Sequence, residues 1–304
     1  MNNLVRDELS PELKEIYDNM IMPVNNNIKL EQVILSKENK EKIQRFKREI
    51  DKRAELLKFG LEPMNRVLLH GASGTGKTFM VKALSNEINF TMLYVDISRA
   101  LSEGNVAQNV SDIFRLANEL GDCIIFLDEC DSVAWRRDDA NNNDSADIRR
   151  ATNSIFQNLD QMNSKCIFVA ATNMLHRIDP AFERRFNMKM KFTRPTLDID
   201  EAVRHFMYQK FKIVDDVETN VREIVKRRAS QNAKLSYYEI EEITKEGMKR
   251  AVLNDSNEVH LKDIYEDLQV SMHFKVRHKT GTDDAEIFRN KLNYEPDIDE
   301  TEYY

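Results

Sequence analysis

The chain has 304 residues, of which 41% are apolar and 32% are charged, and its net charge at pH 7 is −7. The mean hydropathy of −0.58, together with the lack of an apolar run near 18 residues, excludes a membrane-spanning helix. The acidic balance argues against a dedicated nucleic-acid-binding protein, because such a protein needs a basic surface to neutralise phosphates.

The first 57 residues are expected to form a helical lead-in, since Ile43, Phe46, Ile50 and Leu57 are spaced for one apolar stripe. The initial residues contain no apolar stretch of the secretory type, so we expect a cytoplasmic protein. The three cysteines show no metal-ligand spacing. They are interpreted as buried structural thiols in a reducing compartment.

Short apolar runs alternate with amphipathic stretches over residues 58–197. Four runs, at 66–70, 90–95, 123–127 and 166–171, have the length and composition of strands that are buried on both faces. The stretches between them have a helical period. This alternation predicts an α/β domain in which crossover helices cover a parallel sheet.

The pattern after Pro195 is helical only, so residues 198–270 are expected to form a separate small helical domain. Asp198 and Ser236 each stand three residues before a glutamate and mark helix starts of the capping-box type. Residues 271–304 are expected to be a tail that is first basic and then acidic. Such a tail is usually solvated and mobile, and docking of a partner is the alternative.

A glycine-rich segment follows the first predicted strand. The chain has only eight glycines, yet Gly71, Gly74 and Gly76 fall within six positions, directly before Lys77 and Thr78. Glycines let backbone N–H groups surround phosphate oxygens at a helix N-terminus, where the helix dipole is positive. In this pattern the lysine reaches the β- and γ-phosphates and the threonine hydroxyl holds Mg²⁺; an ordinary glycine turn is the alternative. The predicted nucleotide-binding residues of the segment are Gly71, Ala72, Ser73, Gly74, Thr75, Gly76, Lys77, Thr78 and Phe79.

Polar residues end two further strands. Asp128 and Glu129 follow the run 123–127, at the edge of a parallel sheet where ligands bind. We expect Asp128 to hold Mg²⁺ through water and Glu129 to polarise the attacking water. Asn173 follows the run 166–171, where it is placed to orient water opposite the γ-phosphate, although such an asparagine is more often a turn residue.

Two adjacent arginines, Arg184 and Arg185, stand beyond these strands. Exposed arginines are usually only solvated. In many phosphate-transferring enzymes, however, a guanidinium supplied across a subunit interface stabilises the developing charge. This role predicts a homo-oligomer, because an arginine at the far side of a subunit serves only a neighbour's site.

These segments, in this order, resemble the AAA family of ATPases over about residues 28–270. GASGTGKT resembles the family's Walker A segment, IIFLDE its Walker B segment, AATN its sensor 1 segment and DPAFERRF its arginine-finger segment. The resemblance implies a three-layer P-loop NTPase sheet with a C-terminal helical lid, ATP and Mg²⁺ as ligands, and assembly into a hexameric ring. The residues to which it assigns roles are Val33 and Ile34 beside adenine, Lys77 and Thr78 on the phosphates and Mg²⁺, Asp128 on nucleotide-bound Mg²⁺, Glu129 in catalysis, Asn173 at the γ-phosphate, and Arg184 and Arg185 in a neighbouring site.

Two positions depart from the family's pattern. The lid helix starts with Ser-Tyr-Tyr at 236–238, where the family usually has small residues against the nucleotide. Gly104 matches the glycine after the family's pore loop, which puts Ser102 where an aromatic residue is common and Glu103 beside it. Trp135 stands near the place of a second pore loop. The sequence therefore favours ATP hydrolysis more clearly than it favours peptide threading.

The function we expect is ATP hydrolysis by a ring that remodels a protein partner. A DNA-acting AAA+ ATPase, such as a clamp loader or initiator, is the alternative; only the basic stretch 273–279 favours it, against the acidic balance. A third alternative, a P-loop kinase of small molecules, is disfavoured because such a kinase does not need Glu129, Asn173 and Arg185 together. Neither a membrane nor a nucleic acid is the expected partner.

Overall fold

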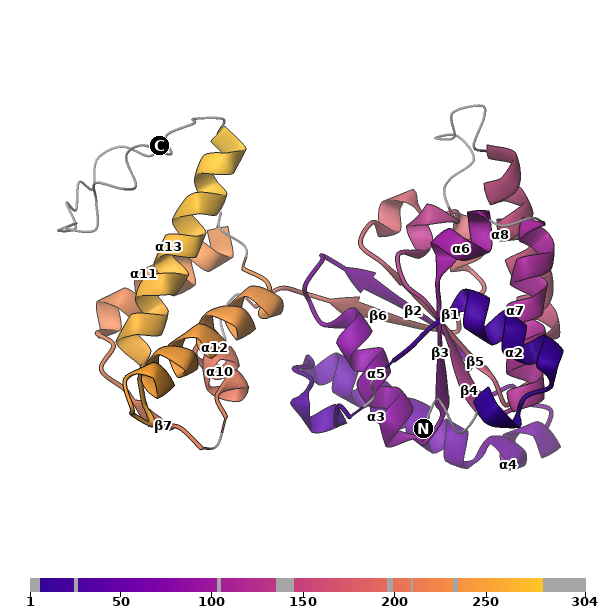
Figure 1. Cartoon of the computed structure of the whole chain (residues 1–304), viewed down its shortest axis with the longest axis horizontal. Helices are drawn as coiled ribbons and strands as arrows, with labels where there is room; N and C mark the ends of the chain where they lie inside the picture. The colour runs from indigo at the N-terminus through magenta and orange to yellow at the C-terminus, as the bar shows by residue number, and fades with distance from the viewer. Residues whose placement is uncertain are drawn as a thin grey trace. The chain divides into compact units, whose positions relative to one another are not determined.

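A computed structural model describes residues 6–24, 27–102, 105–134, 145–195, 199–208, 210–231 and 235–280. Its contacts divide the chain into two units, which Figure 1 shows. The first unit comprises Met1–Arg194 together with Ser236–Tyr238, and the second comprises Pro195–Leu235 and Glu239–Tyr304. Residues 1–57, which we expected to form a lead-in, are therefore part of the first unit.

The first unit is built on a six-stranded sheet with the order β1-β3-β4-β5-β2-β6. All neighbouring pairs are parallel except the pair of β1 and β3, which is antiparallel. The four predicted strands are present, and the α/β class is confirmed. The strands are β1 (Ile21–Met22), β2 (Arg66–Gly71), β3 (Thr91–Val95), β4 (Cys123–Leu127), β5 (Ile167–Thr172) and β6 (Met188–Phe192).

Two strands of the sheet were not predicted. In β6, buried Met188, Met190 and Phe192 alternate with lysines, so this edge strand is not a continuous apolar run. The strand β1 is only two residues long and leaves no periodic signal. Its pairing with β3 brings the N-terminal residues into the sheet, which corrects the expectation of a purely helical lead-in.

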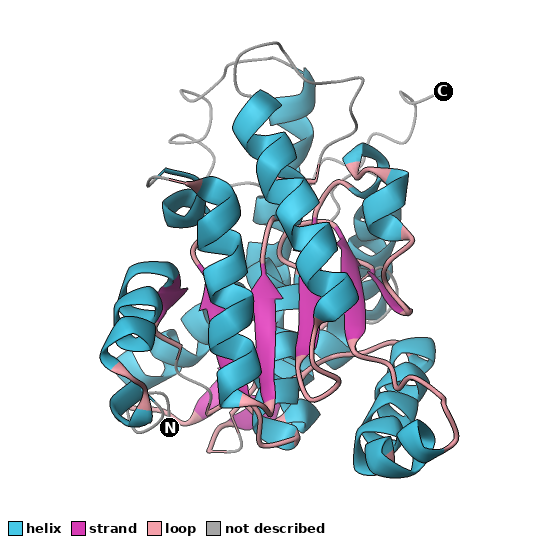
Figure 2. Cartoon of the chain, turned by 90° about the vertical axis from the view of Figure 1, so that its right-hand side faces the viewer, coloured by secondary structure: helices cyan, strands magenta, loops and turns pink. Residues whose placement is uncertain are grey.

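Helices cover both faces of this sheet, as Figures 1 and 2 show. Alternate residues of β4 divide between the two faces: Ile125 and Leu127 pack with α2, α7 and α8, whereas Ile124 and Phe126 pack with α3 and α5. This alternation produces three layers. The helices of the first unit are α2 (Pro11–Met20), α3 (Lys37–Asp51), α4 (Arg53–Lys58), α5 (Lys77–Glu87), α6 (Ile97–Ser102), α7 (Val106–Leu120), α8 (Ser145–Gln161) and α9 (Pro180–Glu183), with 3₁₀ turns η1 (Leu30–Gln32), η2 (Cys130–Ser132) and η3 (Leu175–Arg177).

The second unit is mainly helical, but it also contains two short parallel strands. This corrects the expectation of helices only; each strand has three residues, and only Val259 among them is buried, so no strand pattern appears in the sequence. The last helix continues to Thr280, past the predicted start of the tail at 271. Residues 281–304 lie outside the described part of the chain. The elements are α10 (Ile199–Phe206), β7 (Lys212–Val214), α11 (Thr219–Gln231), α12 (Tyr237–Leu253), β8 (Glu258–His260) and α13 (Leu261–Thr280).

Two further expectations concern the chain as a whole. Cys123, Cys130 and Cys166 are buried free thiols, as predicted. Within the described ranges, no helix is both long enough and apolar enough to cross a membrane.

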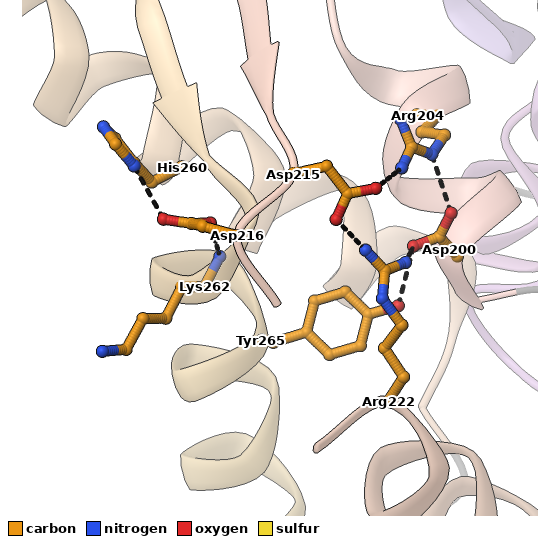
Figure 3. A network of polar contacts seen from close by, with 8 residues as sticks. All are labelled: Asp200, Arg204, Asp215, Asp216, Arg222, His260, Lys262 and Tyr265. Atoms are coloured by element: carbon orange, nitrogen blue, oxygen red, sulfur yellow. Dashed lines mark hydrogen bonds and ion pairs between the residues drawn. The ribbon is translucent and has the colours of Figure 1, made fainter. Parts of the chain in front are cut away.

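A network of charges joins three helices of the second unit (Figure 3). Asp200 on α10 accepts hydrogen bonds from Arg204 at 2.7 Å, from the buried Tyr265 hydroxyl on α13 at 3.0 Å, and from Arg222 on α11. Asp215 accepts from both arginines. Because Asp200 contacts all three helices, we expect this carboxylate to contribute strongly to the stability of the unit.

We expect the substitution Asp200→Asn to lower the free energy of unfolding of the second unit by about 1–3 kcal/mol at neutral pH. Burial raises the pKa of Asp200, but the hydrogen bonds from Arg204 and Tyr265 and the charges of Arg204 and Arg222 outweigh burial, so its pKa lies below the ordinary value. A carboxylate with a depressed pKa stabilises the fold above its unfolded-state pKa and loses this contribution as the pH falls through its folded-state pKa.

Urea unfolding from pH 7 downward measures this contribution. The difference between wild type and Asp200→Asn should stay constant to about pH 5 and narrow below about pH 4. Asp255→Asn, at an exposed aspartate of the same unit, is the control and should change little. If the difference in unfolding free energy between wild type and Asp200→Asn grew as the pH fell, the stabilising role of the Asp200 carboxylate would be contradicted.

Candidate active site

The glycine-rich segment forms the loop between β2 and α5. Gly71, at the end of β2, has φ of 148°, and a Cβ atom there would lie 2.0 Å from the Phe192 carbonyl oxygen on β6. Gly76, at the start of α5, has φ of 93° in the left-handed region. Between them the Thr75 hydroxyl donates to the Ala72 carbonyl at 2.7 Å. The loop therefore needs glycine at one end for close packing and at the other for its backbone turn.

Lys77 connects this loop to the end of β5. Its amino group donates to the carbonyls of Gly71 at 2.8 Å and Ala72 at 2.9 Å, and to the Asn173 Oδ1 atom at 2.7 Å. The side chain is buried, and this burial lowers the pKa of Lys77, although the charge of Asp128 opposes the shift. Two residues predicted from separate segments are thus in direct contact.

Asp128 is surrounded by hydrogen-bond donors. Its Oδ2 atom accepts from the Thr78 hydroxyl at 2.6 Å and from the Tyr94 hydroxyl at 3.2 Å, while Oδ1 accepts from the Glu129 backbone N–H at 3.0 Å. The two residues predicted to hold the metal are therefore adjacent.

The strand order explains why these residues meet. In the sheet, β5 lies between β4 and β2, and all three strands are parallel. The glycine-rich loop follows β2, Asn173 follows β5, and Asp128 follows β4. Since the carboxyl ends of parallel strands share one edge of a sheet, three distant segments converge there.

This edge fits Mg²⁺ bound together with a nucleotide. Magnesium in such sites uses one or two protein oxygen ligands and completes its shell with water and substrate phosphates. The Thr78 hydroxyl and the Asp128 carboxylate supply oxygens of this type, 2.6 Å apart. Over the described ranges, no cluster of three or more histidine, cysteine or acidic side chains offers a metal site made by the protein alone.

Glu129 has an unusual backbone. It adopts φ of 49° and ψ of 43°, in the left-handed region that few residues other than glycine occupy. Hydrogen bonds on both sides hold it there: its N–H donates to Asp128, and its carbonyl accepts from the Ser132 N–H at 2.9 Å. Glu129 is exposed, so its carboxylate is accessible to water at the end of β4.

Two further contacts at this edge were not predicted from the sequence. The hydroxyl of buried Thr172 donates to Asp131 at 2.7 Å and accepts from the Met174 N–H at 2.9 Å, which fixes the turn that carries Asn173. Tyr94 on β3 donates to Asp128. Tyr94 belongs to no sequence motif. Its place beside Asp128 follows only from the pairing of β3 with β4.

The segment predicted to lie along adenine follows η1. The Val33 side chain is buried in the apolar cluster of α3 and α5, against which Phe79 also packs, and Ile34 is half-buried. Contact with adenine therefore stays a prediction, for the Ile34 side chain and the Val33 backbone.

The start of α12 lies against the glycine-rich loop. Ser236–Tyr238 count with the first unit, and the Tyr238 N–H donates to the Gly74 carbonyl at 3.2 Å. A Cβ atom on Gly74 would lie 2.8 Å from the Ser236 side chain. Despite its departure from the family's small residues, this segment reaches the loop.

Arg184 and Arg185 follow α9, and their described contacts are with α8 and α9. Arg184 is exposed, and its Nε donates to the Pro180 carbonyl at 3.2 Å. The Arg185 guanidinium lies 4.0 Å from the centre of the Phe156 ring and forms an ion pair with Asp160 at 3.4 Å. Within one chain, these contacts do not join the arginines to the cluster around Lys77.

The predicted pore residues cannot be placed. Glu103, Gly104 and Trp135 lie outside the described residues, and Ser102 is described only by its backbone at the end of α6.

A glycine-rich loop before a helix, a strand-end acid pair, and an asparagine on the strand between them together define a P-loop nucleoside triphosphatase. Residues 67–194 match the family described as "ATPase family associated with various cellular activities (AAA)". The chain thus contains an AAA-family ATPase domain, and the resemblance drawn from the motifs is confirmed.

Curated relatives agree with this assignment. The chain is 29% identical over 210 residues to proteasome-activating nucleotidase 2 of Halobacterium salinarum, covering 67% of this chain and 50% of the relative. It is 30% identical over 234 residues to a 26S proteasome regulatory subunit 6B homolog of Encephalitozoon cuniculi, covering 74% of this chain and 57% of the relative. It is 27% identical over 261 residues to the AAA family ATPase y4kL of Sinorhizobium fredii, covering 85% of this chain and 75% of the relative. The chain spans about half the length of the first two relatives.

Proposed function

We propose that this chain binds ATP with Mg²⁺ and hydrolyses it to ADP and phosphate. The observation that carries the proposal is the pair of contacts that joins the glycine-rich loop to the ends of two other strands: Lys77 with Asn173, and Thr78 with Asp128. A turn that served only the fold would not need a buried lysine directly after it, at the start of α5.

In this proposal the loop receives the phosphates at the N-terminus of α5, where backbone N–H groups and the helix dipole favour negative charge. Lys77 donates to phosphate oxygens in place of the Gly71 and Ala72 carbonyls. Bound Mg²⁺ would supply charge neutralisation beside Thr78 and Asp128. Glu129 accepts a proton from the attacking water, and Asn173 orients that water against the γ-phosphate.

We further propose a ring, taken as a hexamer, in which Arg184 and Arg185 complete the site of a neighbour. Arg184 supports this role because it is exposed and, among the described residues, its side-chain hydrogen bond goes to the Pro180 main chain of the preceding helix. An arginine supplied from a neighbouring subunit stabilises the charge that develops during phosphoryl transfer.

The substrate class we propose is a protein, remodelled in the cytoplasm. Two of the relatives carry names that connect them with the proteasome, which supports a protein over a nucleic acid as the partner. The net charge of −7 supports the same choice, because a nucleic-acid-binding surface is basic.

We expect Lys77→Ala to weaken ATP binding by at least about 10-fold, because charge-assisted hydrogen bonds to phosphate are lost. Titration of a fluorescent ATP analogue in the presence of Mg²⁺ measures the affinity. Lys82→Ala, at a lysine of the same helix, is the matched control and should bind like wild type. Equal affinities for all three proteins would refute a phosphate-binding role for the loop.

A further inference from the structure

Tyr94 is a tyrosine of β3 that touches the candidate metal site. Its hydroxyl lies 3.2 Å from the Oδ2 atom of Asp128, the same oxygen that accepts from the Thr78 hydroxyl at 2.6 Å. A phenolic hydroxyl is protonated at neutral pH, so it donates in this contact and the carboxylate accepts.

The sheet fixes the position of Tyr94 from both sides. On one side Tyr94 is the register partner of Phe126 in β4, two residues before Asp128, and the two rings lie 5.1 Å apart. On the other side Met22 of the antiparallel strand β1 is its partner. The hydroxyl is therefore held rigidly over the end of β4. The short strand β1 contributes to this by pairing with β3 at Tyr94.

Donors occupy three positions on the Asp128 carboxylate. Each carboxylate oxygen has two acceptor positions. Tyr94 and Thr78 fill both positions of Oδ2, while the Glu129 N–H takes one position of Oδ1. Among the described residues no further donor contacts Oδ1, so one of its acceptor positions stays available for a metal-bound water. This arrangement sets the rotation of the carboxylate.

We propose that Tyr94 is a positioning residue for Asp128, which holds the carboxylate in the orientation that Mg²⁺ and its water require. The inference rests on the proposed function and deepens it, because it adds to the site a residue that none of the motifs includes. Tyr94 acts through Asp128, so its removal should change the dependence on Mg²⁺ and leave metal-free nucleotide binding unchanged.

The test is Tyr94→Phe, which removes one oxygen and keeps the ring packed on Phe126. In a titration of a fluorescent ATP analogue, we expect the Mg²⁺ concentration for half-maximal binding to rise about 3- to 10-fold, the range for losing one of several hydrogen bonds. Affinity for the analogue in EDTA should equal that of wild type. Tyr17→Phe, which removes the hydroxyl of a buried tyrosine on α2, is the control and should not shift the Mg²⁺ midpoint.

A double-mutant cycle separates positioning from a general structural effect. In an Asp128→Asn background, Tyr94→Phe should produce no further change in the Mg²⁺ midpoint. Equal changes in both backgrounds, or an unchanged midpoint in Tyr94→Phe alone, would overturn the inference. If wild type itself binds the analogue without any dependence on Mg²⁺, the proposed function fails, and the inference fails with it.

Discussion

Glu129→Gln is expected to lower the rate of ATP hydrolysis by about 10²- to 10⁴-fold, the usual contribution of a general base. The amide has nearly the same size as the carboxylate but does not accept a proton from water. ATP affinity should be unchanged, because Lys77 and Thr78 hold the phosphates and the metal independently of Glu129. Phosphate release and equilibrium nucleotide binding, measured on the same preparation, separate the two effects.

The control for this variant is Glu119→Gln, at an exposed glutamate of α7. It should hydrolyse ATP at the wild-type rate. Wild-type turnover by Glu129→Gln would show that another group activates the water, and the left-handed backbone of Glu129 would then have no catalytic explanation.

The combined variant Arg184→Ala/Arg185→Ala should lose about 10³-fold or more in turnover, as other enzymes do when an arginine supplied across an interface is removed. Nucleotide binding should persist, because the described contacts of both arginines lie on α8 and α9. The rate of phosphate release at saturating ATP measures the effect.

The single variants separate catalysis from stability. Arg185 packs over Phe156 and pairs with Asp160, so Arg185→Ala should also lower the melting temperature. In the described part of the chain, Arg184 neither stacks on a ring nor pairs with an acid, so Arg184→Ala should keep the wild-type melting temperature. Arg45→Ala, at an exposed arginine of α3, is the control for removing a surface charge. Wild-type turnover by the combined variant would show that neither arginine completes the catalytic site of a neighbouring subunit.

Much of the fold was predictable because the central strands form apolar runs, and because the glycine-rich loop, the acid pair and Asn173 stand at strand ends. The run 123–127 and its acid pair show this most clearly, since β4 has these bounds and Asp128 contacts Thr78. The elements that were missed are short or partly exposed: β1 has two residues, and in β6 lysines interrupt the apolar pattern. Such strands depend on pairing with neighbours, which local sequence does not reveal.

The candidate site divides in the same way. Residues within a motif, such as Lys77 and Asn173, were predicted, and the structure brings them within 2.7 Å. Tyr94 donates to Asp128 and belongs to no motif, so only the folded sheet reveals this contact. Thr172 donates to Asp131, although the AATN segment in which it stands assigns a role only to Asn173. The roles proposed for the two arginines would require a second subunit, so no feature of one chain determines them.

Complementation between two inactive variants is the most direct test of a site shared by neighbouring subunits. Lys77→Ala keeps both arginines, and Arg184→Ala/Arg185→Ala keeps the glycine-rich loop, so each alone should be inactive. In an equal mixture that co-assembles at random, about a quarter of the interfaces join an intact loop to intact arginines, so turnover should recover to that order. Co-assembled mixtures without ATP hydrolysis, or full wild-type turnover by a demonstrably monomeric chain, would contradict the shared site.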